Sequence, residues 1–161
     1  MPGSILGNRV LRKEDPKFLT VGGKYVDDLA DEPRLANAAF VTYVRSSVAH
    51  GTITGIDTSA AADLPGVIAV LTAEDLEIVE EPAAFNPAVT RGNLALGKVR
   101  FVGEPIAVVV SETRRQGEDA AEQVIIDYDP LDVLVDPEAA MSSTTLIYEG
   151  TGRRAGSRSG P

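Results

Sequence analysis

The chain contains one histidine, His50, which is the first residue whose chemistry could serve a reaction. An imidazole can act as a general base or bind a metal ion, because its charge changes close to neutral pH. Catalysis by a histidine normally needs a second group that orients the ring, and the sequence fixes no such group. We therefore expect His50 to make a structural hydrogen bond.

Carboxylates with possible chemistry stand at two further places. Glu104 lies beside an apolar run, where it could be partly desolvated, but we favour a role as a cap of backbone amides at a bend. Asp127 and Asp129 would share one face of a strand, with Asp132 after the following turn. These three could bind a hard cation, but without further oxygen ligands at close spacing we expect a solvated strand edge.

Glycine and cysteine usage limits the cofactors that the chain itself could hold. Gly22-Gly23 and Gly103 match neither the dinucleotide-binding fingerprint nor the phosphate-binding loop. The chain has no cysteine, so it can form no disulfide, thiolate zinc site or iron–sulfur ligation of its own.

Charge limits the partners in the same way. The 24 acidic and 15 basic residues give a net charge of -9, which repels phosphate backbones and makes nucleic acid and anionic membranes poor partners. No apolar segment approaches the length of a membrane span, so we expect a cytoplasmic location without membrane insertion.

Residues 106–110 predict the strand around which the chain is organised. They are five consecutive apolar residues, four of them β-branched. A run without alternation has no solvent face, so it predicts a strand buried on both sides, near the middle of a sheet. Further strands are predicted at 18–21, 38–45, 52–57, 67–71, 99–102, 124–128 and 133–135.

Helix signals lie between these strands. Thr113 and Gln116 have the spacing of a capping box, and they predict a helix that begins at this point. A stripe of small residues lets that helix lie close to the sheet: Gly117, Ala120, Ala121 and Val124. The succession of strand, helix and strand over 106–128 suggests a right-handed parallel crossover. Together with short helices at 60–64 and after Asp136, this predicts an α+β fold with a mixed sheet and a few short helices.

At 161 residues the chain is long enough for one domain. We expect an extended N-terminal arm at 1–17, a folded domain at 18–150 and a disordered tail at 151–161. The composition changes abruptly at the tail, which is typical of a truncation or a change of reading frame. Within the domain, residues 77–97 are the least ordered stretch, and a loop of this length is either functional or docked on another surface.

Four blocks of sequence, in this order and at this spacing, carry a family resemblance. They are residues 7–10 with 24–28; 44–47 with 49–50 and 56–58; 64–67 with 70–72; and 99–105 with 121–122 and 127–128. Together they resemble the N-terminal part of the large subunit of molybdenum-dependent hydroxylases. This is the family of xanthine dehydrogenase, aldehyde oxidase and aerobic carbon monoxide dehydrogenase, and the carbon monoxide dehydrogenase branch is the most similar.

The resemblance implies an α/β hammerhead domain with a structural and assembly role in an oxidoreductase. In that family the molybdenum-pterin contacts and the catalytic glutamate lie beyond the hammerhead, so we predict no catalytic, cofactor-binding or metal-binding residue in this chain, and no activity of the chain alone. The implied partners are the cofactor-bearing remainder of the large subunit and the subunits that carry FAD and iron–sulfur clusters. The alternative is a free-standing acidic binding module that uses the 77–97 loop.

Overall fold

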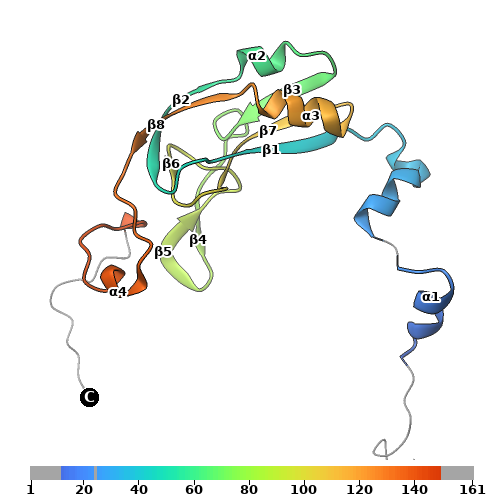
Figure 1. Cartoon of the computed structure of the whole chain (residues 1–161), viewed down its shortest axis with the longest axis horizontal. Helices are drawn as coiled ribbons and strands as arrows, with labels where there is room; N and C mark the ends of the chain where they lie inside the picture. Colours follow the sequence, from blue (N-terminus) through green and yellow to red (C-terminus); the bar gives the residue numbers. More distant parts are fainter. Residues whose placement is uncertain (1–11, 24, 150–161) are drawn as a thin grey trace, which may run out of the picture. The chain divides into compact units, whose positions relative to one another are not determined.

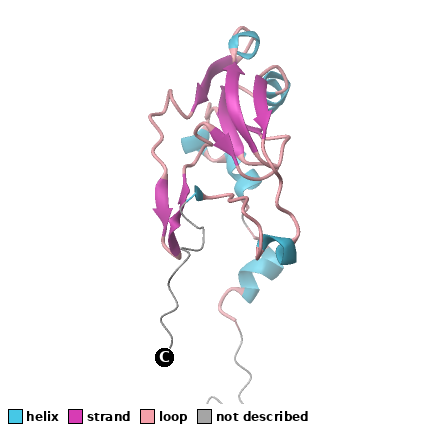
Figure 2. Ribbon diagram, turned by 90° about the vertical axis from the view of Figure 1, so that its left-hand side faces the viewer, coloured by secondary structure: helices cyan, strands magenta, loops and turns pink. Residues whose placement is uncertain are grey.

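The computed structural model describes residues 12–23 and 25–149, and the chain divides into two compact units, Met1–Ala38 and Ala39–Pro161. Figures 1 and 2 show both units. Residues 1–11 of the predicted arm and the predicted tail at 151–161 lie outside the described residues. Within the described ranges, no helix is long and apolar enough to cross a membrane.

In its described residues, the first unit consists of short helices. They are α1 (Asp15–Thr20) and the 3-10 helices η1 (Val26–Asp31) and η2 (Pro33–Leu35). The strand predicted at 18–21 is therefore wrong. Asp15 and Pro16 stand in the first turn of α1, where an acidic side chain and a proline favour a helix start. Phe18 and Leu19 remain 55% and 85% exposed, and the described residues of this unit contain no strand with which the segment could pair.

The second unit contains eight strands and three helices in its described part (Figure 1). The strands are β1 (Phe40–Arg45), β2 (Gly51–Asp57), β3 (Val67–Thr72), β4 (Glu81–Ala83), β5 (Asn86–Arg91), β6 (Lys98–Val99), β7 (Pro105–Ser111) and β8 (Ile125–Pro130). The helices are α2 (Ser59–Ala62), α3 (Arg114–Ala121) and α4 (Pro137–Ala140). The strands form three sheets, with the orders β1-β7-β3, β6-β2-β8 and β4-β5.

Strand β7 is the central strand of the first sheet, as residues 106–110 predict. It pairs antiparallel with β1 on one side and with β3 on the other. Ile106, Ala107 and Val109 are fully buried, and Val108 is 8% exposed. Successive residues point to opposite faces of the sheet, so both faces of β7 are covered.

The predicted crossover is wrong, because β7 and β8 belong to different sheets. Strand β8 pairs antiparallel with β2, and every pairing among the described strands is antiparallel. The α+β class is confirmed, but the sheets are antiparallel rather than mixed.

Helix α3 packs closely against the first sheet. Thr113 is its N-cap, and its hydroxyl accepts a hydrogen bond from the amide of Gln116, as predicted. Gly117 is buried at the contact, where a Cβ atom would lie 2.5 Å from Thr42 Oγ1 and 2.6 Å from Ser111 Oγ. The glycine therefore sets how closely the helix approaches β1 and β7, and Ala120 extends the contact into the core of Val44, Ala107 and Val109.

Three further predictions, one of a loop and two of strands, need correction. Residues 77–97 contain the β4-β5 hairpin, although Pro82 and Pro87 are poor strand residues. The strand predicted at 99–102 is reduced to β6, which ends at Val99. Residues 133–135 form no strand, and Val133 and Val135 are 53% and 83% exposed. A branched apolar run thus forms a strand here only where a neighbouring strand can pair with it.

Candidate functional site

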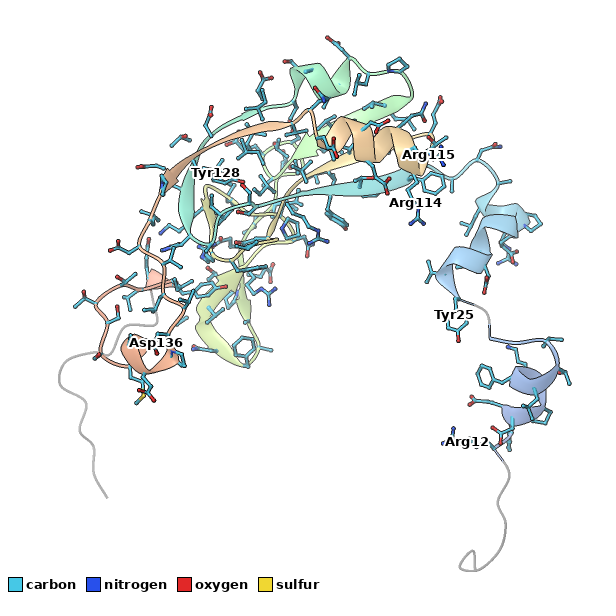
Figure 3. All side chains as sticks on the ribbon, in the orientation of Figure 1. Arg12, Tyr25, Arg114, Arg115, Tyr128 and Asp136 are labelled. Atoms are coloured by element: carbon cyan, nitrogen blue, oxygen red, sulfur yellow. The ribbon has the colours of Figure 1, made fainter. Side chains whose placement is uncertain are left out.

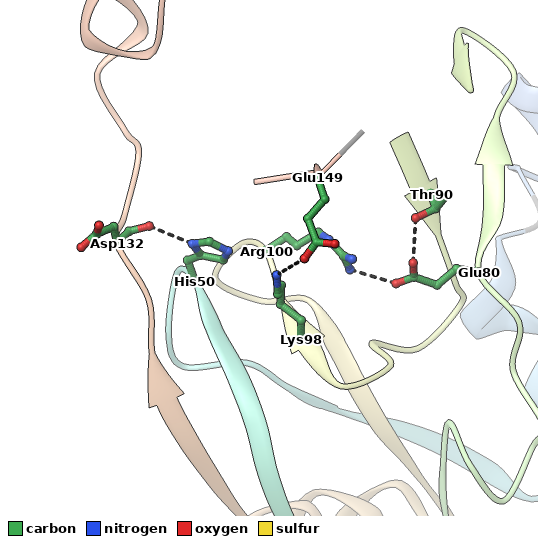
Figure 4. A network of polar contacts seen from close by, with 7 residues as sticks. All are labelled: His50, Glu80, Thr90, Lys98, Arg100, Asp132 and Glu149. Carbon is green, nitrogen blue, oxygen red and sulfur yellow. Dashed lines mark hydrogen bonds and ion pairs between the residues drawn. The ribbon is translucent and has the colours of Figure 1, made fainter. Parts of the chain in front are cut away.

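A cluster of polar side chains is centred on Arg100, directly after β6 (Figure 4). Val99, fully buried against β2, fixes the backbone so that the Arg100 side chain is 13% exposed. Arg100 Nη1 lies 2.9 Å from Glu80 Oε1, and the other oxygen of Glu80 accepts a hydrogen bond of 2.7 Å from Thr90 Oγ1. Arg100 thereby connects β6 to the segment before β4 and to β5.

The same arginine also contacts the C-terminal part of the unit. Its guanidinium carbon lies 5.0 Å from the centre of the Tyr148 ring, in a cation–π arrangement. Next to it, Lys98 Nζ lies 3.0 Å from Glu149 Oε1. The hydrogen bond and the charge of Lys98, with a smaller contribution from Arg100, lower the pKa of the exposed Glu149 carboxyl below its usual 4.5.

These side chains line a depression of about 670 Å³. Both of its cations, Lys98 and Arg100, are already bonded to carboxylates, so the depression offers no unengaged cation to an anionic pterin cofactor. Arg100 Nε is buried and has no hydrogen-bond partner among the described residues. The arrangement is suited to holding three segments of chain together, and the residues do not fit a molybdenum-pterin group.

His50 makes the structural hydrogen bond that the sequence analysis expects. Its ring is 5% exposed, and Nδ1 lies 2.8 Å from the backbone oxygen of Asp132. A carbonyl can only accept, so Nδ1 donates this hydrogen bond. Nε2 is buried and unpaired within the described part of the chain, so a substrate in solution has no access to it. Together with the bond from the amide of Leu131 to the His50 carbonyl, the ring fixes the chain as it leaves β8.

Glu104 caps a backbone amide at the bend, which is the role that the sequence favours. One of its carboxylate oxygens accepts a hydrogen bond from the backbone amide of Arg100 across the bend. The bend includes Gly103, whose φ of +87° lies in the region that glycine adopts without strain. Glu104 therefore closes the turn between β6 and β7.

The three aspartates form no cation site. Asp127, Asp129 and Asp132 are exposed, and the described residues contain no group of three or more potential metal ligands. Of the two glycines at 22 and 23, Gly22 has a positive φ of +75° and follows the end of α1. Its place is that of a helix-terminating glycine.

Sequence reasoning missed the Arg100 cluster. Glu80, Thr90 and Tyr148 are 20, 10 and 48 positions from Arg100, and no short motif relates them. The available signal was weak: an isolated arginine directly after a β-branched residue, next to a predicted bend.

Comparison with known families gives a match over residues 20–132, to the family described as aldehyde oxidase and xanthine dehydrogenase, a/b hammerhead domain. The chain is 40% identical over 144 residues to the nicotine 6-hydroxylase large subunit of Paenarthrobacter nicotinovorans, covering 86% of this chain and 17% of that protein. It is 43% identical over 139 residues to the carbon monoxide dehydrogenase large chain of Afipia carboxidovorans, covering 84% and 16%.

Solved structures agree with these matches. The crystal structure of the Cu,Mo-CO dehydrogenase in its carbon monoxide reduced state aligns with a TM-score of 0.71 at 43% identity, over 84% of this chain and 17% of that one. The chain thus spans less than a fifth of the length of these relatives.

Proposed function

Because this chain belongs to the aldehyde oxidase and xanthine dehydrogenase a/b hammerhead family, we propose that it serves as the hammerhead portion of the large subunit of a molybdenum-dependent hydroxylase. Its role in such an oxidoreductase is structural: it packs against the part of the subunit that bears the cofactor and supports assembly. The chain alone is inactive.

The proposal rests on one observation: the match covers most of this chain but only a small share of each relative. The similarity extends over 84% to 86% of this chain but only 16% to 17% of two relatives named as a large subunit and a large chain. An activity of those proteins draws on a polypeptide about six times longer than the matched part. The contribution of this chain is therefore that of one structural part.

The Arg100 depression supports a structural role over a cofactor-holding one. Its cations are bonded to Glu80 and Glu149, and the chain has no cysteine with which to bind an iron–sulfur cluster. We assign the molybdenum-pterin cofactor to the remainder of the large subunit, and FAD and iron–sulfur clusters to partner subunits. When bound there, the molybdenum group supplies the redox chemistry of hydroxylation.

Co-expression tests the proposal. The affinity-tagged chain is produced together with the carbon monoxide dehydrogenase large chain of the relative, from which the matched segment has been deleted. The relative's own segment, supplied in the same way, is the positive control. We expect both segments to co-purify with the remainder at a ratio of one to one.

Failure of this chain to co-purify where the positive control succeeds would overturn the proposal. That result would favour the alternative of a free-standing binding module that uses residues 77–97.

A further inference from the structure

Strand β1 is an edge strand that lies beside helix α3. It pairs with β7 on one side only, and among the described residues its second edge pairs with no strand. An unpaired strand edge presents a row of backbone donors and acceptors that can pair with an added strand. The β1 sequence, Phe-Val-Thr-Tyr-Val-Arg, is rich in residues that favour strands.

A groove follows this edge. It consists of two adjoining hollows of about 370 and 280 Å³ that share Tyr43 and Arg45. Figure 3 labels one residue in each hollow, Arg114 at the start of α3 and Tyr128 in β8. Since a strand rises about 3.3 Å per residue, the six residues of β1 give the groove a length of roughly 20 Å.

The wall of the groove at β1 is apolar and exposed. Val41 and Tyr43 are 55% and 48% exposed, although they lie in a strand whose partner residues, Val110 and Val108, belong to the core strand. An extended segment that pairs with β1 would cover both side chains.

The side of the groove at α3 is acidic. Glu118, in α3, lines the first hollow, and Glu122, the C-cap of α3, lines the second together with residues of β8. Both are exposed, and neither carboxylate has a hydrogen bond or ion pair within the part of the chain that the structure describes. The positive side chains of the groove are engaged: Arg45 Nη1 bonds to the Gly103 carbonyl at 2.9 Å and stacks on Tyr43, and Arg114 also has a partner.

We propose that the groove between β1 and α3 accepts one extended segment from the remainder of the large subunit. This segment alternates apolar residues with Lys or Arg, pairs with β1 as an added strand and places its cations opposite Glu118 and Glu122. The inference rests on the proposed function, because the segment comes from the polypeptide that makes the relatives about six times longer than the matched region.

A second copy of this chain is a poorer occupant. Two chains with a net charge of -9 repel each other. The β1 strand also offers only Arg45 as a cation, and that side chain is already bonded to Gly103. A segment of the remainder that alternates apolar and basic residues can cover the apolar side chains of β1 and also pair with the two carboxylates.

The test uses the same co-expression and two charge-matched double variants. Glu118→Lys with Glu122→Lys reverses both groove carboxylates, and Asp63→Lys with Asp119→Lys makes the same change in charge at exposed positions that do not line the groove. We expect the groove variant to reduce co-purification with the remainder at least tenfold and the control variant to leave it unchanged.

Cross-linking gives a second readout that does not depend on a loss of binding. Because the chain has no cysteine, Val41→Cys creates a single attachment site for a photo-reactive maleimide, and Ile68→Cys does the same on β3, the other edge strand of the sheet. Ile68 is 61% exposed, close to the 55% of Val41. We expect only the Val41 site to cross-link to the remainder, at a segment that contains Lys or Arg.

The outcomes separate the two proposals. Equal co-purification of the two double variants, or a cross-link from Ile68 but not from Val41, would overturn the groove assignment while the proposed function stands. A cross-link from Val41 to a second copy of this chain would overturn the choice of occupant. If the unchanged chain does not co-purify with the remainder, the proposed function is overturned, and this inference with it.

Discussion

Replacement of Val109 by aspartate tests the central position of β7. The side chain is fully buried between β1 and β3 and belongs to the core that α3 covers. The groups around it are apolar, namely Val44, Ala61, Ala107 and Ala120, so a carboxylate at this site has no partner. Burial of an unpaired polar group costs several kcal/mol, and protonation of the carboxyl reduces this cost without removing it.

The magnitude follows from two steps. Truncation to alanine removes two buried methyl groups, worth about 0.8 kcal/mol each, and leaves a small cavity, so Val109→Ala should cost about 2 kcal/mol. Val109→Asp adds the polar term and should cost about 5 kcal/mol or more, comparable with the total stability of about 5–15 kcal/mol of an ordinary domain. We expect the alanine variant to melt roughly 6–10 °C lower, and the aspartate variant to be largely unfolded at 25 °C.

Urea and thermal melts followed by circular dichroism measure both effects. Ile68→Asp on the neighbouring strand β3 is the control, because Ile68 is 61% exposed and the change there should stay within about 0.5 kcal/mol. A midpoint of Val109→Asp equal to that of the unchanged chain would refute the placement of β7 at the centre of the sheet.

Three further predictions concern the Arg100 cluster, the α3 contact and acid stability. Arg100→Ala leaves the Glu80 carboxylate without its cation, so amide hydrogen exchange in the β4-β5 hairpin should accelerate about tenfold while exchange in β7 stays unchanged. Gly117→Ala should lower the melting temperature by several degrees despite the better helix propensity of alanine, because the new Cβ meets side-chain oxygens at 2.5 and 2.6 Å; an unchanged melting temperature would contradict the close contact. Hydrogen bonds from the hydroxyl and amide of Ser59 lower the pKa of Asp57 from 3.8. The stabilisation of the folded state by Asp57 is therefore present above pH 3.8 and is lost as the pH falls through the lower folded-state pKa. Urea midpoints measured between about pH 2 and 5 should depend less on pH in Asp57→Asn than in the unchanged chain.

The elements predicted correctly are those with a local cause. The run at 106–110 identified β7 because five apolar residues without alternation need cover on both faces. Thr113 and Gln116 identified the start of α3 because an N-cap bond acts within four residues, and the Thr113 hydroxyl accepts from the Gln116 amide. Asp136 likewise caps α4 by accepting bonds from the amides of Glu138 and Ala139.

The errors arose where distant residues decide the structure. Residues 18–21 have the composition of a strand, but Pro16 lies in the first turn of a helix, and the described residues of their unit contain no strand that could pair with them. The hairpin at 81–91 is held in part by Glu80, which bonds to both Thr90 and Arg100, and the sequence gives no indication of that contact. The crossover failed because the partner of β8 is β2, about 70 positions upstream, and periodicity does not identify a strand's partner.

For the candidate site, the sequence predicted single roles but not the grouping. The hydrogen bond of His50 and the cap by Glu104 are both present. The acidic wall of the β1 groove was missed because Glu118 and Glu122 look like ordinary solvated residues of a helix. Only the position of α3 beside an edge strand brings them into hollows that β1 also lines.

The most direct test of the account is the molybdenum content of three samples: the purified chain, the hammerhead-deleted large chain of the relative, and the complex of the two. Each is quantified by mass spectrometry of the metal after size-exclusion chromatography. We expect no molybdenum in the chain alone, and in the complex one molybdenum per pair of chains, held by the remainder. Stoichiometric molybdenum in the isolated chain would contradict it.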